Sequence, residues 1–344
     1  MALSLRKNSD GGTVGLDIDG RFLAAVQVSG GRLTNVASAE LPEGVLADGE
    51  VVDRDALSAA LKDFIAAANL PRRVQLGVSN QQIVVRVLEL PRIDDPSERD
   101  AALRFSAADA IAMPLDEAVL DHQIAGYVTS SDGTERMQVV VVAARRTMIE
   151  EYLAAVRDAG LKPEGIDLDA FALVRMLADE APATREQPVS NGLDGTPPGE
   201  QSFADGSPAP TEPLPPLDLP PSARVFCHLG GVSNLAIAVG SSCLFSRTLS
   251  TPYGADGAAA RLADEIRLSI DYYMSQPNAL AVGDILLSGE GSRDATLVDG
   301  VGAQLGLPVA AAAPLGGLDI SGIPAGDDPH RYTVAAGLAI GASA

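Results

Sequence analysis

Two glycine-containing stretches of this sequence have residue types and spacing suited to binding phosphate. In the first, Asp17 precedes the turn Asp19-Gly20-Arg21. Glycine lets a tight turn present its backbone N–H groups to an anion, and a nearby carboxylate can hold the Mg²⁺ that accompanies a polyphosphate. Asp17, Gly20 and Arg21 are therefore candidate nucleotide-binding residues, with Asp17 as the candidate metal ligand. Taken alone, the stretch is better interpreted as an ordinary hairpin.

The second stretch runs from His228 to Gly240 and again places glycines between apolar segments. A third glycine turn, Ser288–Ser292, follows a buried strand and precedes a helix predicted over Asp294–Leu305. A strand that runs through a glycine turn into a helix is typical of phosphate and nucleoside sites. The candidate binding residues in these two stretches are Gly230, Gly231, Ser233, Gly289 and Gly291.

The predicted strands on either side of these glycine turns form a unit that occurs twice in the chain. Val14–Ile18 and Leu23–Val28 flank Asp19-Gly20, which predicts two strands joined by a type I′ hairpin turn. The stretch from His228 repeats the pattern of strand, glycine turn and strand. One unit at the head of each half indicates an internal duplication. Helices alternating with the other strands predict an α/β fold.

Helices between these strands are predicted from apolar spacing and end signals. One is expected to begin at Ser97 as its cap and to bury the stripe Ala101, Phe105, Ala108, Ile111 and Ala112. Another is expected to begin at Thr147, with Glu150 completing a capping box. The small residues of 331–341 predict a helix that packs closely against its neighbours.

The composition excludes several classes of protein. The 344 residues carry a formal net charge of −21, which argues against binding nucleic acid and against adhesion to anionic lipid. No apolar run reaches the length of a spanning helix, and no secretory signal is visible at the start. The two cysteines lack metal-type spacing. We predict a cytosolic protein without direct membrane insertion.

Residues 180–222 differ from the rest of the chain, because they hold 11 of its 23 prolines. A segment this poor in apolar residues cannot bury enough surface to offset its ordering entropy. We predict a disordered linker there, with a proline-rich docking segment as the alternative. A disordered start is predicted for residues 1–12.

These glycine stretches resemble the phosphate loops and the adenosine-facing turn of actin and the sugar kinases. The ordered chain further resembles the PilM family of type IV pilus assembly proteins. The segments that carry this second resemblance are 41–44, 48–53, 90–91, 113–118, 120–123, 159–163, 265–273 and 332–339. The resemblance implies an actin-like, ribonuclease H-like duplicated fold with an inserted α+β subdomain. The first half would be 13–179, with the insertion at about 37–146, and the second half 223–344.

The resemblance also implies a function. Proteins of this family bind ATP and hold the cytosolic N-terminal tail of the membrane protein PilN in a cleft beside the inserted subdomain. This chain would then be a cytoplasmic adaptor, peripheral at the inner face of the membrane through a PilN-like single-span protein. It would couple motor and platform components in pilus assembly and twitching motility.

The sequence departs from the family pattern at the residues that serve phosphate. Asp19 stands where the first loop has Gly, Ala24 where a Lys is expected, and His228 where the second loop has Asp. An extra carboxylate repels a polyphosphate unless Mg²⁺ intervenes, and Arg21 compensates only in part for the lost cation. These changes predict weak or vestigial ATP binding, uncertain Mg²⁺ binding and little or no hydrolysis, with no catalytic residue assigned.

Two alternatives use the same superfold. An ATP-dependent kinase of small molecules needs intact phosphate loops and a general base, and neither is evident. A cell-division scaffold resembling FtsA would carry a C-terminal amphipathic membrane helix, and no such helix is visible before Ala344.

Overall fold

The computed structural model describes residues 13–129, 133–181 and 222–342. The segments predicted to be disordered, 1–12 and most of 180–222, lie outside these residues. Within them the chain forms two five-stranded sheets, a three-stranded sheet and a small two-stranded one, β4 (Leu46–Ala47) with β5 (Glu50–Val51). Among the described residues, no helix has both the length and the apolar character needed to cross a membrane.

The first sheet has the strand order β10-β6-β1-β2-β3. Its strands are β1 (Val14–Ile18), β2 (Phe22–Ser29), β3 (Arg32–Glu40), β6 (Arg73–Val78) and β10 (Lys162–Leu168). The first three pair antiparallel, whereas β6 and β10 run parallel to β1. Every residue of β1 is buried, which explains its apolar sequence around Asp17.

The second sheet repeats this arrangement with the order β13-β12-β11-β14-β15. Its strands are β11 (Ala223–His228), β12 (Asn234–Val239), β13 (Ser242–Thr248), β14 (Val282–Ser288) and β15 (Val309–Ala311). Three consecutive strands again pair antiparallel, and two later strands add in parallel. The two sheets therefore share one topology, as the predicted duplication requires.

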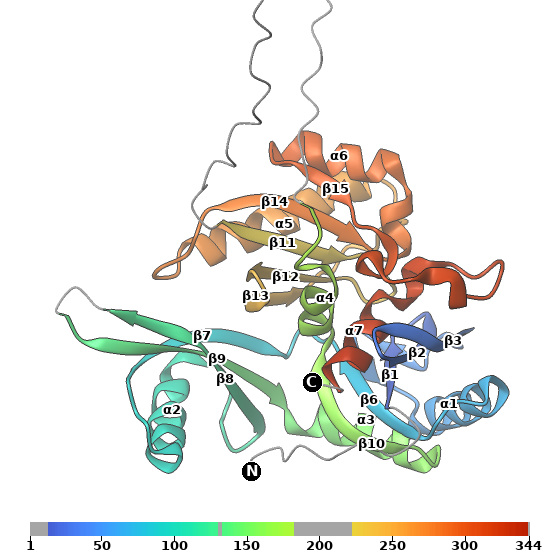
Figure 1. Cartoon of the computed structure of the whole chain (residues 1–344), viewed down its shortest axis with the longest axis horizontal. Helices are drawn as coiled ribbons and strands as arrows, with labels where there is room; N and C mark the ends of the chain where they lie inside the picture. The colour runs from blue at the N-terminus through green and yellow to red at the C-terminus, as the bar shows by residue number, and fades with distance from the viewer. Residues whose placement is uncertain (1–12, 130–132, 182–221, 343–344) are drawn as a thin grey trace, which may run out of the picture.

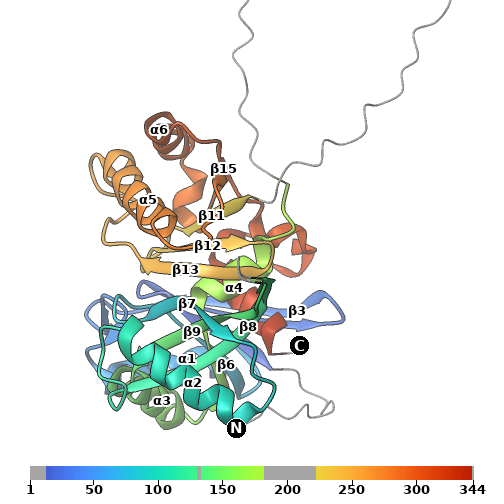
Figure 2. The same cartoon turned by 90° about the vertical axis from the view of Figure 1, so that its left-hand side faces the viewer.

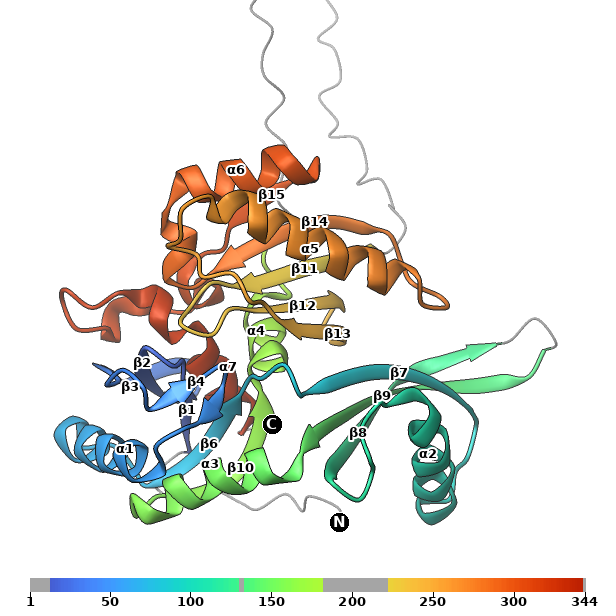
Figure 3. The same ribbon diagram turned by 180° about the vertical axis from the view of Figure 1, so that it is seen from behind.

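Helices cover the outer face of each sheet. The first sheet carries α1 (Arg54–Ala68) and α3 (Arg146–Asp158), and the second carries α5 (Ala258–Met274) and α6 (Ala295–Leu305). Figure 3 shows α5 and α6 on the upper sheet and α1 and α3 on the lower one. Short 3₁₀ helices complete the second half: η1 (Glu290–Arg293), η2 (Pro314–Gly317), η3 (Ile320–Gly322) and η4 (Pro329–Tyr332).

Two helices lie between the sheets, namely α4 (Asp169–Leu177) and α7 (Thr333–Gly341) (Figure 1). Their apolar residues share one core with residues of both sheets, including Phe22 and Phe226. The predicted close packing of α7 is confirmed. A Cβ on Gly15 of β1 would stand 2.0 Å from the carbonyl oxygen of Ala335 in α7. The two halves are therefore built around a common centre.

A separate layer leaves the first half between β6 and β10. It consists of β7 (Val84–Pro91), α2 (Pro96–Ala110), β8 (Ala118–Thr129) and β9 (Glu135–Arg145), with the sheet order β7-β9-β8. It has its own apolar core and projects sideways in Figure 1, while Figure 2 shows α2 in front of its sheet. This is the inserted α+β subdomain that we predicted.

Its predicted start at about residue 37 is wrong. Strands β3 and β6 belong to the first sheet, and α1 packs on that sheet's outer face. The inserted layer begins only at Val84. Residue 37 lies inside β3, which pairs with β2 in the first sheet. The division into halves at 13–179 and 223–344 remains our proposal.

Three local predictions were also wrong. Helix α2 is capped by Asp95, not by Ser97, because Pro96 occupies its first turn. Its buried side chains are Leu103 and Ala107, whereas Phe105 of the predicted stripe is 78% exposed. Helix α3 begins at Arg146, directly after β9, so Thr147 lies inside the helix rather than at its cap.

Candidate functional site

The first candidate loop joins β1 to β2 at the centre of the first sheet. Asp19 and Phe22 close the turn, with the Asp19 N–H donating to the Phe22 carbonyl over 3.1 Å. Among its residues Gly20 alone has positive φ, at 97°. The turn therefore resembles type II′ and not the predicted type I′, which needs positive φ at two successive residues. Asp17 and Asp19 are both buried, while Arg21 is exposed.

The second candidate loop joins β11 to β12 and faces the first. The backbone N–H of Gly231 donates to both carboxylate oxygens of Asp19 at 2.7 Å. A Cβ on Gly230 would stand 2.1 Å from the Asp19 carboxylate. The structure thus brings together the loops that the sequence predicted, and a carboxylate of the first loop fills the space in front of the second.

Ser233, by contrast, faces its own loop. Its hydroxyl donates to the Gly230 carbonyl at 3.4 Å and is buried. In this arrangement the hydroxyl stabilises the turn and is not presented to an incoming ligand. In the second loop, the group with the best-defined contact across the interface is therefore the backbone N–H of Gly231, which donates to Asp19.

The third turn follows β14 and leads through η1 into α6. Gly289 has a φ of 81°, which favours glycine, and Asp294 caps α6 by accepting from Thr296 and Leu297. The ring of Tyr253 packs against Gly291, because a Cβ there would stand 2.7 Å from the ring. Gly289 and Gly291 are thus close-packed positions next to an aromatic side chain that the sequence analysis did not single out.

A chain of polar contacts links this turn to both halves. Arg21 donates to the Tyr253 hydroxyl at 2.8 Å, and that hydroxyl donates to Glu290 at 3.0 Å. Glu290 also pairs with Arg331, which forms a second ion pair with Glu40 of β3 at 2.9 Å. The Arg331 guanidinium also lies over the Phe22 ring, 4.9 Å from its centre. The contacts run from the first loop across the third turn and back to the first sheet.

Three buried carboxyl groups lie beneath the two loops. Burial, with the charges of Asp169 and Asp19 nearby, raises the pKa of Asp17 well above its usual range. Burial raises the pKa of Asp19 to about 7 and that of Asp169, at the start of α4, to about 8. Hydrogen bonds from the Gly231 and Arg21 backbone oppose the rise at Asp19. Carboxyl groups this close cannot all ionise cheaply.

The sequence analysis missed Asp169. One of its oxygens, Oδ1, is buried and has no hydrogen-bond partner among the described residues. It lies near Gly77 of β6, where a Cβ would stand 2.3 Å from it. The available signal was its place immediately after β10, since residues at the carboxyl ends of parallel strands gather at the ligand-binding edge of a sheet.

His228 ends β11 beside the same loops. Its Nδ1 lies 3.1 Å from the Ser288 hydroxyl, while Nε2 has no partner among the described residues. Burial lowers the pKa of His228 to about 4, so the ring is neutral at physiological pH. The described residues contain no group of three histidines, cysteines or acids placed to hold a metal ion. Asp17 as a metal ligand therefore stays a prediction.

Two polar residues of α5, Glu265 and Arg267, have structural roles. Glu265 of α5 accepts from the backbone of Ser250 and Thr251 and so fixes the loop after β13. Arg267 pairs with Asp264 and donates to the carbonyl of Gln304 in α6. Both are explained by the folded chain without a ligand.

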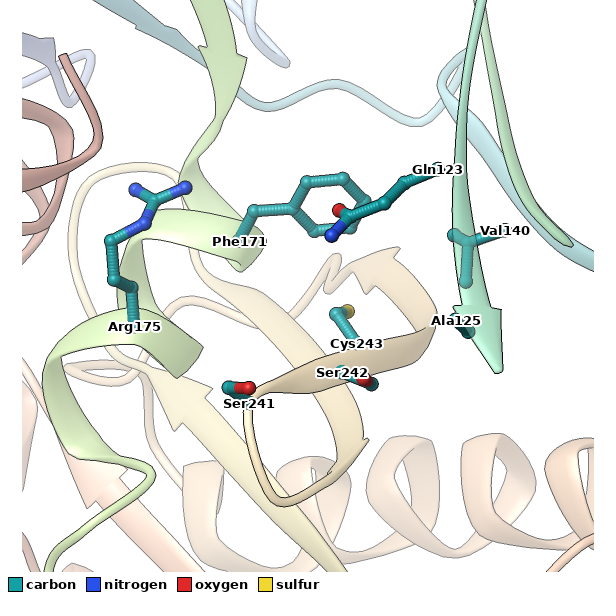
Figure 4. A pocket seen from close by; sticks show the side chains of 8 residues that line it. All are labelled: Gln123, Ala125, Val140, Phe171, Arg175, Ser241, Ser242 and Cys243. Atoms are coloured by element: carbon teal, nitrogen blue, oxygen red, sulfur yellow. The ribbon is translucent and has the colours of Figure 1, made fainter. Parts of the chain in front are cut away.

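A groove lies beside the inserted subdomain, between β8, α4 and β13. Its volume is about 230 Å³. Figure 4 shows the side chains that line it: Gln123, Ala125, Val140, Phe171, Arg175, Ser241, Ser242 and Cys243. Strands β8 and β13 are each at the edge of their sheet. An edge strand offers unpaired backbone groups, so the groove combines main-chain hydrogen-bonding capacity with apolar side chains.

Arg175 of this groove is held in place by two contacts. Arg175 donates to the Gly337 carbonyl at 2.7 Å and pairs with Asp167 at 2.8 Å. Burial raises the pKa of the Cys243 thiol to about 12, so it stays protonated. These contacts leave a preformed surface, which lowers the entropic cost of binding an extended ligand.

The two sheets of equal topology, with glycine loops meeting between them, define the duplicated α/β fold of the actin-like class. A chain from a solved PilM–PilN type IV pilus biogenesis complex has this fold, with a TM-score of 0.72 at 22% identity. The match covers 96% of this chain and 98% of that one.

Two solved structures of lower similarity match almost the whole chain. The cytoplasmic domain of EpsL, an inner-membrane component of the type II secretion system of Vibrio cholerae, is 11% identical with a TM-score of 0.45, and 96% of this chain and 93% of that one are covered. The ethanolamine utilization protein EutJ from Carboxydothermus hydrogenoformans is 10% identical with a TM-score of 0.47, covering 97% and 90%.

The family model of the type IV pilus assembly protein PilM matches residues 15–187. This chain belongs to the PilM family of type IV pilus assembly proteins. Both the predicted family and the predicted actin-like fold are confirmed.

Proposed function

We propose that this chain is a cytosolic adaptor that binds the N-terminal tail of a PilN-like single-span protein of the inner membrane. Its membership of the PilM family, with a structural match over 98% of a chain from a PilM–PilN complex, carries the proposal. The adaptor would lie at the inner face of the cytoplasmic membrane through this partner. There it would connect pilus motor and platform components and contribute to twitching motility.

The groove of Figure 4 is the proposed tail site. An extended tail can add to the edge of a sheet, where main-chain hydrogen bonds supply affinity and side-chain pockets supply specificity. Strand β8 provides the edge, and Val140, Phe171 and Cys243 provide apolar contacts. We propose this groove as the predicted cleft beside the inserted subdomain.

The nucleotide part of the proposal is weak or vestigial binding of ATP, with little or no hydrolysis. Gly230, Gly231, Gly289 and Gly291 would let the backbone approach the nucleotide, and Asp17 is the residue that would hold Mg²⁺. Asp19 hydrogen-bonds the Gly231 N–H at 2.7 Å, which supports weakened phosphate binding. The buried neutral His228, where the family pattern has Asp, supports lost hydrolysis.

A binding experiment tests the adaptor. The ligand is a synthetic peptide of the residues that precede the span of the single-span protein encoded beside this chain, titrated calorimetrically. Ala125→Arg places a long charged side chain in the groove and is expected to weaken binding at least about tenfold. Ala108→Arg, on the exposed face of α2, adds the same side chain elsewhere and is the matched control.

If Ala125→Arg bound the peptide as tightly as the wild type, the groove would not be the tail site. Absence of binding by the folded wild-type chain would remove the partner. The nucleotide part is tested separately by titrating Mg-ATP and measuring phosphate release. Sustained turnover would contradict a vestigial site and favour the kinase alternative.

A further inference from the structure

The Asp19 side chain is held like a bound ligand. It is 4% exposed, and both of its carboxylate oxygens accept the N–H of Gly231 at 2.7 Å, across the interface between the two halves. The Arg21 backbone supplies a further hydrogen bond. Glycine-rich turns that direct backbone N–H groups toward one point are anion sites, and the anion at this point is the chain's own.

The space over the second loop has no room for another anion. Points where a Cβ would stand on Gly230 and Gly231 lie 2.1 and 2.4 Å from the Asp19 oxygens. The point at Gly230 also lies 3.2 Å from His228 Nε2, which is buried and has no partner among the described residues. A polar atom without a partner therefore faces the same small volume.

The adjoining part of the interface is also filled from within. The Tyr253 ring lies against Gly291, and its hydroxyl joins Arg21 of the first loop to Glu290 of the third turn. Arg331 then connects Glu290 with Glu40 in the first sheet. Apart from Arg21, these contacts use residues far from Asp19 in sequence, and they are a further observation of closure between the same two halves.

We propose that the chain supplies its own ligand to its nucleotide cleft. The Asp19 carboxylate occupies the phosphate position of the second loop, and the Tyr253 ring with Glu290 and Arg331 closes the neighbouring space. The two halves are thereby tied together without nucleotide. An external polyphosphate binds only by displacing Asp19, so the carboxylate acts as an internal competitor. This inference deepens the nucleotide part of the proposed function and is independent of tail binding.

The proposal predicts a gain of binding when the internal ligand is removed. Asp19→Gly deletes the carboxylate and keeps a turn in which glycine is acceptable. We expect it to bind Mg-ATP and inorganic tripolyphosphate roughly tenfold more tightly than the wild type, because a charge-assisted hydrogen bond no longer competes. Asp19→Asn, which keeps the shape and one acceptor, is expected to lie between the two. Calorimetry on the full chain measures all three.

The matched control is Asp109→Asn, which changes an exposed acid of α2 and alters net charge by the same amount as Asp19→Asn. Its affinity for both ligands should equal that of the wild type. A gain of the same size in this control would assign the effect to general charge and overturn the proposal. Folded Asp19→Gly or Asp19→Asn variants with wild-type affinity for both ligands would also overturn it.

A second measurement does not depend on any variant. In the ligand-free wild type, hydrogen exchange of the segment containing Gly231 should be slow, and it should accelerate in whichever Asp19 variant folds. Fast exchange of the Gly231 amide in the wild type would overturn the internal ligand. Tight Mg-ATP binding by the wild type would instead contradict the weak site of the proposed function, so the two failures are distinguishable.

Discussion

Gly337 of α7 lies so close to α4 that a Cβ on it would stand 2.2 Å from the carbonyl oxygen of Ala172. The Gly337 carbonyl in turn accepts from Arg175 of the same partner helix at 2.7 Å. This contact joins the two helices that share the central core with both sheets. Because backbone meets backbone, no rotamer change can relieve an added side chain.

Gly337→Ala is therefore expected to destabilise the protein by about 2–3 kcal/mol, since overpacking a dense core forces backbone shifts. Chemical denaturation followed by circular dichroism measures this. Gly254→Ala, at a glycine with open space around its Cβ position, is the matched control and should change stability by less than about 0.5 kcal/mol. Equal effects of the two substitutions would contradict the packing explanation.

Helix α2 provides a prediction about exposed and buried apolar residues. Leu103 is 3% exposed and Phe105 is 78% exposed. Leu103→Ala should cost about 2–4 kcal/mol, because it removes a buried side chain from a small core. Phe105→Ser should change stability by no more than about 0.5 kcal/mol. If thermal unfolding showed Phe105→Ser to be more destabilising than Leu103→Ala, the apolar stripe predicted from sequence would be the buried one.

The buried acids predict how stability depends on pH. The pKa of Asp169 is raised from 3.8 to about 8 and that of Asp19 to about 7. An acid whose pKa is higher in the folded chain contributes stability below its unfolded pKa and loses it as pH rises through the folded pKa. The free energy of unfolding should therefore decline as the pH rises from the unfolded pKa of 3.8 toward the folded pKa of about 8.

Asp169→Asn replaces one of these two acids by a side chain that does not ionise. We expect stability to decline less steeply between pH 3.8 and about 8 in this variant than in the wild type. Asp109→Asn, on the surface, should leave the wild-type slope unchanged. Urea unfolding at a series of pH values measures the slope. A slope in Asp169→Asn as steep as that of the wild type would show that folding does not raise the pKa of this carboxyl group.

His228 predicts the opposite slope at lower pH. Its pKa is lowered from 6.5 to about 4, so its contribution to stability is complete above the unfolded pKa and is lost as pH falls through the folded pKa. Replacing it by Asn, which can keep a hydrogen bond to Ser288, should reduce the loss of stability across that acidic interval. The same unfolding series tests this, and an unaltered acid limb would contradict it.

Much of the fold was predictable because its signals are local. The alternation in β1 and β2, the glycine turn between them and the repeat at β11 and β12 all lie within short windows. This repeat indicated the duplication, and the family resemblance gave the inserted subdomain. Turn type was harder to predict, because a type I′ turn also requires positive φ at the residue after Gly20, and Arg21 does not adopt it.

The errors concern information that is not local. The partner of Asp19 lies 212 residues away, so no window contains both. Ala-rich α2 offers two possible faces, and only the sheet beneath it selects Leu103 over Phe105. Asp169 follows an ordinary strand, and its proximity to the other acids depends on the parallel pairing of β10 with β6.

The central position of α7 also has a consequence for biosynthesis. During translation β1 emerges early, but the helix that packs on its Gly15 emerges late. Until then the nascent first half exposes an apolar sheet face, and such surfaces are prone to aggregation and bind chaperones. The first half therefore cannot complete its core until α7 has been synthesised and has packed against β1.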